Sequence, residues 1–91
     1  MQNKSKNTLK LRKILGETYK ELRIKLSNKT RSKIEDEFDL AKSTISRVEE
    51  AKFDCKFLTI WKMAEAIGVK PSQIIMMVEE KLGDGFKLID E

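Results

Sequence analysis

The side chains of residues 42–47 offer the most specific chemistry in this chain. Within six residues they bring together one ammonium group, one guanidinium group and three hydroxyls, those of Lys42, Arg47, Ser43, Thr44 and Ser46. Arginine and lysine can donate hydrogen bonds to the acceptor atoms of a guanine edge, and hydroxyls can bond either bases or phosphates. The segment therefore predicts hydrogen-bonded recognition of a partner.

Two short helices with a tight turn between them would position these side chains. Thr30 has the side chain of an N-cap for the first helix, which we expect to end near Phe38. Ile34 and Phe38 are four residues apart and should both point inward. The turn then falls at Asp39-Leu40.

The second helix of the pair is expected from about Ala41 to Ala51. Ile45 and Val48 are three residues apart, so they would pack one face of this helix against its neighbours. The polar and basic side chains of residues 42–47 are then left on the outer face.

Three further amphipathic helices complete the expected fold, which is all-α. The first runs from Thr8 to a stop at 27–29, where Asn28 can adopt the left-handed conformation. Its apolar stripe consists of Leu11, Leu15, Tyr19, Leu22 and Leu26.

The other two helices follow the pair. One stops at Gly68 and carries an apolar stripe of Phe57, Ile60, Trp61, Ala64 and Ile67, so Trp61 is expected in the core. The last opens with Pro71 and ends before Gly83, with an apolar face of Ile74, Ile75, Val78 and Leu82.

Ninety-one residues are enough for one domain with a single core. We expect a disordered basic segment at 1–7, one helical domain at 8–82 and a C-terminal tail at 83–91 that serves dimerisation or docking. Residues 1–33 hold eleven Lys/Arg and two Glu, a net charge of +9, and residues 34–91 hold eight Lys/Arg and thirteen Asp/Glu, a net −5. This asymmetry favours a polyanion-facing side, although a lysine-rich composition from an AT-rich genome would give the same excess.

Several classes of protein are excluded by composition. Cys55 is the single cysteine and the chain has no histidine, so an intramolecular disulfide, Cys/His metal clusters and a histidine-based triad are ruled out. No apolar run approaches the ~20 residues that span a membrane, and the first residues lack the apolar core of a signal peptide. We therefore expect a non-enzymatic cytoplasmic protein without a metal or cofactor.

Two segments carry a resemblance to a known family. They are Ser43-Thr44-Ile45-Ser46-Arg47-Val48-Glu49 in the second helix of the pair and Met63-Ala64-Glu65-Ala66-Ile67-Gly68-Val69 at the end of the fourth helix. In this order and at this distance they resemble the phage-repressor type of helix-turn-helix domain, the Cro/CI-like or XRE group. The resemblance implies a compact five-helix bundle of the lambda-repressor type whose helices 2 and 3 read DNA.

The resemblance also implies roles for individual residues. It places Arg31 on a phosphate or the first base, and it places nearest the bases Ala41, Lys42, Ser43 and Arg47. Thr44 and Ser46 complete the expected DNA-binding set. Glu49 is expected to form a structural ion pair with a basic residue of the first helix, for which Arg23 is the candidate.

Four positions depart from the family pattern. Asp39 stands where the turn has a glycine, and aspartate tolerates a left-handed backbone better than most residues. Glu35 replaces a small alanine and would loosen or bend the contact between the two helices. Ala51 replaces a glycine after the third helix, and Arg31 replaces a glutamine. The acidic run 35–37 must point away from DNA, or binding is weak.

The sequence thus predicts a sequence-specific DNA-binding transcriptional regulator, a repressor of prokaryotic or phage type. It would bind double-stranded DNA as a homodimer held by the fifth helix or the tail, and would be nucleoid-associated while bound. The alternative is an antitoxin or other protein-interaction module of the same fold. Such a module would bind a protein partner through its acidic half and autoregulate.

Overall fold

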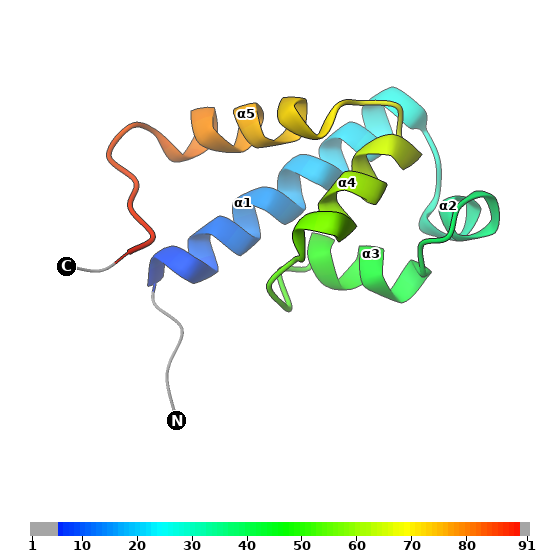
Figure 1. The fold of residues 1–91 in the computed structure, drawn as a ribbon, viewed down its shortest axis with the longest axis horizontal. Coiled ribbons are helices and arrows are strands. Elements are labelled where there is room, and N and C mark those ends of the chain that lie inside the picture. Colours follow the sequence, from blue (N-terminus) through cyan, green and yellow to red (C-terminus); the bar gives the residue numbers. More distant parts are fainter. Residues whose placement is uncertain (1–5, 90–91) are drawn as a thin grey trace.

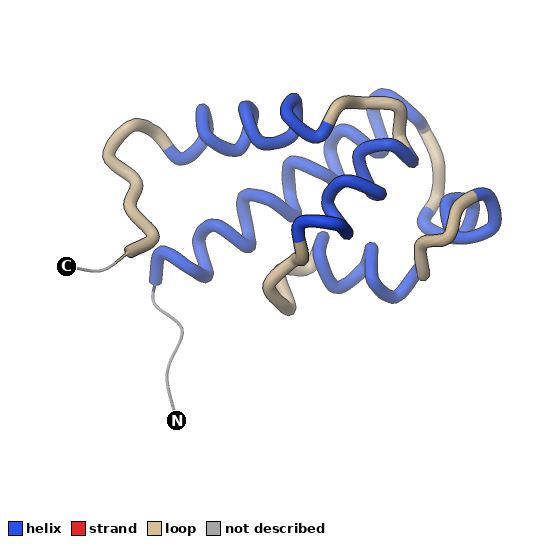
Figure 2. Tube along the Cα trace, viewed as in Figure 1, coloured by secondary structure: helices blue, strands red, loops and turns tan. Residues whose placement is uncertain are grey.

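The computed structural model describes residues 6–89, which form five α-helices and one π-helical turn and contain no β-strand (Figures 1 and 2). The elements are α1 (Lys6–Leu22), η1 (Arg23–Ser27), α2 (Arg31–Glu37), α3 (Lys42–Glu49), α4 (Phe57–Ala66) and α5 (Pro71–Leu82). The all-α fold class predicted from the sequence is confirmed.

Helix α1 is the central element. Figure 1 shows α5 along one side of α1 and α3 along the opposite side, with α4 crossing nearer the viewer and α2 beyond α3. The packing agrees, since α1 contacts both α5 and α3, while α2 packs on α3 and α4 on α5. Tyr19, in α1, is fully buried, and its hydroxyl donates a 2.9 Å hydrogen bond to the Met63 carbonyl of α4.

The core lies between these helices and draws on every one of the five α-helices. Its buried residues are Tyr19, Leu22, Ile34, Leu40, Ile45, Val48, Met63, Ala64, Ala66, Ile67, Ile74 and Val78. Ile45 and Val48 point inward from α3 as expected, which fixes the opposite face of α3 outward.

The helix ends use the expected residues. The Thr30 hydroxyl accepts a 3.1 Å hydrogen bond from the Lys33 N–H at the start of α2. Asn28 adopts the left-handed conformation with φ 53°. Pro71 is the first residue of α5, and Gly68 follows α4 with φ 80°. Short-range signals therefore placed most element boundaries within two residues.

The first helix begins earlier than predicted. The expected disorder of residues 1–5 lies outside the described residues, but Lys6 and Asn7 belong to α1. The Asn7 side chain donates a 2.6 Å hydrogen bond to the carbonyl of Lys87, so the start of α1 meets the C-terminal tail. In that tail, residues 83–89 are outside the helices, with Phe86 half-buried and Leu88 exposed.

The apolar stripe predicted for the first helix is wrong at its last member. Leu26 is 62 % exposed because it lies in η1, where the Asn28 N–H bonds the Arg23 carbonyl at 2.9 Å. A π-helical turn holds more residues than an α-helical turn, so it rotates the side chains that follow. Leucine spacing alone does not reveal this insertion.

The apolar stripe predicted for the fourth helix is buried at Ile60, Ala64 and Ile67, but its two aromatic members are exposed. Trp61 is 46 % exposed and Phe57 is 71 % exposed, so the prediction of a core tryptophan is wrong. Helix α4 has apolar residues around most of its circumference, and Ile60, Met63 and Ile67 take the core side. Periodicity cannot choose between two apolar faces of one helix.

The turn between α2 and α3 also differs from expectation. Asp39 does not adopt a left-handed conformation, because Phe38 is extended and the Leu40 N–H bonds the Phe38 carbonyl at 2.9 Å. Phe38 is 40 % exposed and lies under the Lys29 ammonium group, whereas Leu40 enters the core. The backbone avoids the strain that a glycine would otherwise relieve.

Gly16 allows α1 and α3 to meet. A Cβ atom at this position would lie 2.5 Å from the carbonyl oxygen of Val48 and 2.7 Å from that of Glu49. We expect Gly16→Ala to lower the free energy of unfolding by about 1–3 kcal/mol, because backbone atoms must move apart. Urea denaturation measures this. An unconstrained helical glycine would show a stabilisation of up to about 1 kcal/mol on the same change.

Ala51 ends α3 in a conformation that suits glycine. It has φ 60°, and the Lys52 N–H bonds the Arg47 carbonyl at 2.8 Å, which completes a Schellman motif. Helix α4 ends with the same bonding at Gly68. We expect Ala51→Gly to raise the free energy of unfolding by about 0.5–1 kcal/mol and Gly68→Ala to lower it. Denaturation curves of the two variants that shift in the same direction would refute this.

Candidate nucleic-acid interface

The outer face of α3 carries the side chains selected from the sequence. Lys42, Ser43 and Arg47 are exposed, and Thr44 and Ser46 are partly exposed. Ala41 is exposed at the N-cap and supplies no side-chain cap. All six therefore lie on or beside one polar surface, opposite the buried Ile45 and Val48.

Glu35 provides the cap that Ala41 lacks. Its carboxylate accepts a 2.9 Å hydrogen bond from the backbone N–H of Lys42, the first residue of α3. A carboxylate at this point is also stabilised by the positive end of the α3 helix dipole. The expected loosening of the α2–α3 contact is therefore replaced by a direct bond between the two helices.

Arg47 is held by an aromatic side chain that sequence reasoning did not select. Its guanidinium carbon lies 4.8 Å from the centroid of the Phe53 ring, in the loop after α3. A guanidinium stacked on a ring loses less freedom when it forms hydrogen bonds. Phe53 thus limits where Arg47 can reach from the end of α3.

The buried carboxylate of Glu49 organises the other side of this region. The Glu49 side chain has no exposed surface, and it accepts bonds of 2.7 and 2.9 Å from two nitrogens of Arg23. The ion pair expected between Arg23 and Glu49 is therefore present. The hydrogen bonds from Glu49 raise the pKa of the Arg23 guanidinium above its ordinary value, and burial opposes this rise.

Arg31 shares the same carboxylate. Its guanidinium donates bonds of 2.8 and 3.1 Å to Glu49, and its side chain is 26 % exposed. The residue expected on a phosphate or a first base therefore points, in this structure, toward an internal partner. Arg23 also donates a 2.9 Å bond to the Lys29 carbonyl, so the cluster of Arg23, Arg31 and Glu49 ties together η1, the following loop, α2 and α3.

An open basic cleft lies beside this ion-pair cluster. Its volume is about 380 Å³, and it is lined by Lys20, Arg23, Thr30, Arg31, Ser32 and Lys42. Four of these six side chains are cationic, and two carry hydroxyls. Such a lining matches an anion with several oxygen atoms, of which a phosphate group is the common biological case.

Lys20, like Ser32, lines this cleft but was not among the residues singled out from the sequence. It lies near the end of α1, three residues before Arg23 at the start of η1, and this helical spacing places both side chains on one side of the continuous helix. The three-residue spacing can be read from the sequence, but other basic residues of the first helix are spaced in the same way. Only the packing of α2 and α3 against α1 shows which lysine faces the cleft.

Most of the acidic side chains in the run at 35–37 bond to neighbouring groups. Glu37 forms ion pairs with Lys29 and Lys33, with N–O distances of 2.8 and 3.3 Å. Hydrogen bonds from these two lysines hold the pKa of Glu37 below its ordinary value. Glu35 caps α3. Two of the three acids therefore engage local partners, which reduces their repulsion toward an anion.

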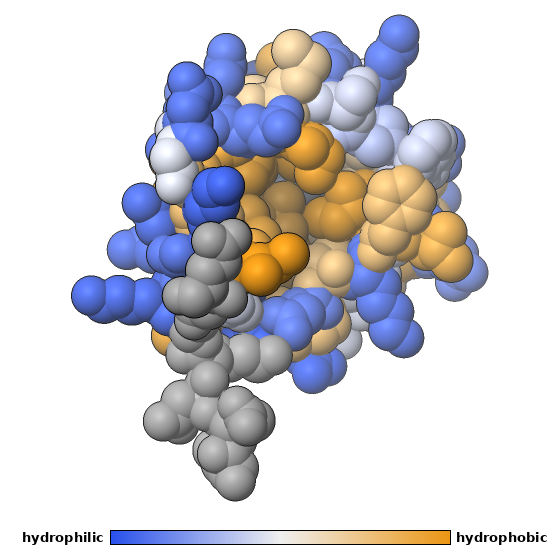
Figure 3. All heavy atoms as spheres, turned by 60° about the vertical axis from the view of Figure 1, so that its left-hand side comes forward, coloured by the Kyte–Doolittle hydropathy of each residue, from blue (hydrophilic) through white to orange (hydrophobic). Residues whose placement is uncertain are grey.

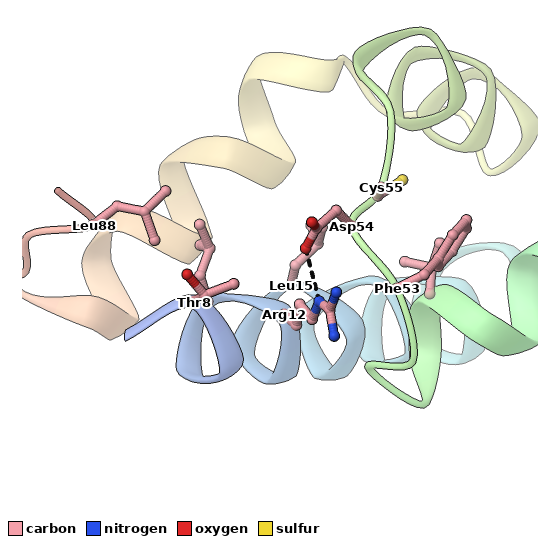
Figure 4. Close-up of a pocket in the computed structure, with 9 residues that line it drawn as sticks. Thr8, Arg12, Leu15, Phe53, Asp54, Cys55 and Leu88 are labelled. Atoms are coloured by element: carbon pink, nitrogen blue, oxygen red, sulfur yellow. Dashed lines mark hydrogen bonds and ion pairs between the residues drawn. The ribbon is translucent and has the colours of Figure 1, made fainter. Parts of the chain in front are cut away.

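A second hollow lies between the first half of α1, the loop after α3 and Leu88 of the tail (Figure 3). It has a volume of about 320 Å³, and its lining includes Leu15, Phe53, Cys55 and Leu88. Figure 4 shows these side chains around the ion pair in which the Arg12 Nε lies 2.8 Å from an Asp54 carboxylate oxygen. Burial raises the pKa of the Cys55 thiol to about 11, so the thiol stays protonated at neutral pH.

Residues 6–89 offer neither a metal site nor a membrane-spanning helix. The described side chains include no group of three His, Cys, Asp or Glu that could hold a metal ion. In the same part of the chain, each helix is too short or too polar to cross a membrane.

Comparisons with protein-family models, curated proteins and solved structures find no significant match to this chain. A function therefore has to be inferred from the geometry of the described residues. The main features of that geometry are the outer face of α3, the basic cleft beside it, and the Glu49 carboxylate that holds both in place.

The Glu49 ion pairs give a stability prediction with a neighbouring control. Glu49→Gln removes the charge that two arginines share, and we expect a loss of about 3 kcal/mol because Arg23 stays buried without a counter-charge. Glu50→Gln changes an exposed carboxylate 3.8 Å from Arg31, and its effect should stay within about 0.5 kcal/mol. Chemical denaturation of both variants measures the difference, and equal losses would contradict a central role for Glu49.

Proposed function

We propose that this protein is a sequence-specific DNA-binding regulator that reads the major groove with α3. Helices α2 and α3 would then form a helix-turn-helix, with α3 as the recognition helix. The observation that carries the proposal is the outer face of α3, where Lys42, Ser43 and Arg47 are exposed on a helix whose other side is locked into the core. The resemblance to phage-repressor-type domains supports the same assignment.

The arrangement of the α3 side chains suits base recognition. The start of α3 carries short hydroxyl side chains that allow close approach to base edges. Arg47 lies further along the helix and can bond two acceptor atoms of one guanine. Its contact with Phe53 orients the guanidinium before DNA arrives, which favours specificity over simple charge attraction.

The basic cleft suits the phosphate backbone. Lys20 and Lys42 are exposed at its rim, while Arg23 and Arg31 form its inner wall beside Glu49. Phosphate contacts supply most of the affinity and fix the position of the protein, whereas base contacts supply the discrimination. The cleft adjoins the start of α3, so one DNA strand can pass from the cleft to the recognition helix.

Selection of bound fragments from random DNA tests the proposed function directly. The purified chain is incubated with the pool, bound fragments are sequenced, and the enriched fragment is titrated at two salt concentrations. An enriched motif with salt-dependent affinity supports the proposal. Salt-dependent binding without a motif would refute sequence-specific reading. An absence of DNA binding would favour the protein-interaction module.

Arg47 and Lys20 should respond differently to removal. We expect Arg47→Ala to cost about 1–3 kcal/mol on the selected site and much less on unrelated DNA, because a base contact is lost. Lys20→Ala should weaken binding to all sequences about equally and reduce the salt dependence by about one counterion. Fluorescence anisotropy with specific and scrambled duplexes measures both.

The exposed tail lysine Lys87 provides the charge-matched control for these variants. Lys87→Ala removes one positive charge away from α3 and the cleft, so its effect should be the smallest of the three. If Arg47→Ala lowers the affinity for both duplexes by the same factor, Arg47 does not read bases.

A further inference from the structure

Helix α4 presents three large apolar side chains to solvent. Phe57 is 71 % exposed, Leu58 is 72 % exposed and Trp61 is 46 % exposed. The rings of Phe57 and Trp61 form an edge-to-face pair with centroids 5.8 Å apart. These three side chains define the α4 face, and they lie within five consecutive residues, so they form one patch.

We propose that the α4 face binds the α4 face of a second copy of this chain, with a two-fold axis between them. The inference rests on the proposed function, since it supplies the symmetry that a one-helix DNA reader needs. Aromatic residues are enriched in the centres of protein interfaces, and exposed clusters of this kind are uncommon on monomers. Lys62 and Glu65 flank the patch with opposite charges, so a second copy does not meet a surface of a single charge sign.

The position of α4 relative to α3 favours a second copy as the occupant. Figure 1 looks down the shortest axis of the molecule, and α4 lies on the side toward the viewer, with α3 at the lower edge. The two-fold axis of the proposed dimer would run vertically in this view, in front of α4. Rotation about this axis leaves both α3 helices at the lower edge. Both recognition helices could then face one DNA duplex.

The outer face of α5 does not give this arrangement. Ile75 and Met76 are exposed there, at 44 % and 59 %, and the sequence had suggested the fifth helix as the dimer contact. Figure 1 shows α5 on the opposite side of α1 from α3. A two-fold contact through the outer face of α5 would point the two α3 helices away from each other.

The available area predicts a weak dimer. The exposed parts of the three side chains amount to roughly 350 Å² per copy, because a whole aromatic side chain offers about 150–250 Å². A stable interface of standard size buries about 800 Å² per partner. Two copies should therefore associate reversibly, and adjacent half-sites on DNA should strengthen the contact by holding both copies together.

Self-association without DNA tests the interface. Leu58→Glu places a charge on the α4 face, and Met76→Glu places the same charge on α5 at a similarly exposed position. We expect sedimentation equilibrium to show that Leu58→Glu raises the dissociation constant at least about tenfold, while Met76→Glu leaves it within about twofold. Trp61 is the one tryptophan of the chain, so its emission should shift to the blue as the concentration of the unmodified protein rises.

The outcomes separate this inference from the proposed function. A chain that stays monomeric up to about 1 mM and binds paired half-sites without cooperativity would overturn the α4 interface, even if DNA binding is specific. Equal weakening by Met76→Glu would overturn it as well. Concentration-dependent Trp61 emission that Leu58→Glu abolishes would support the interface, even if no DNA motif is enriched.

Discussion

The carboxylate of Glu49 is the point on which the rest of the structure depends. It is fully buried and takes hydrogen bonds from Arg23 and Arg31 at 2.7–3.1 Å. A buried charge of this kind is tolerated only when its partners are held in good geometry, so the three side chains fix one another. Through them the end of α3 is bound to the start of η1 and the start of α2.

Two features of the backbone make this cluster attainable. Gly16 lets α3 approach until its last carbonyl groups nearly touch α1. Arg23 lies seven residues further, two turns along the same face, and begins the π-helical turn that follows α1. A side chain at position 16 would push α3 away and lengthen the path from Arg23 to Glu49.

The same framework orients the candidate DNA-binding surface. Ile45, Val48 and Glu49 hold the inner side of α3, so its outer side has one orientation relative to the basic cleft. Local contacts then refine the surface, with Glu35 bonded to the start of α3 and Phe53 stacked on Arg47. The proposed reading of DNA therefore uses a rigid helix whose flexible arginine is already restrained.

The dimer inferred through α4 uses the side of that helix that the core does not bury. Ile60, Met63 and Ile67 fill the core side, so the aromatic residues of α4 remain exposed.

The sequence by itself determined the five α-helices, most of their ends and the inward face of α3, because periodicity, capping and chain breaks act within a few residues. It also pointed to the Arg23–Glu49 pair, but only by way of resemblance to a family. The tertiary structure decided which face of α4 is buried, that Arg31 turns toward Glu49, and that Lys20 joins the cleft. These depend on how helices distant in the chain pack together, and no local pattern of residues encodes that packing.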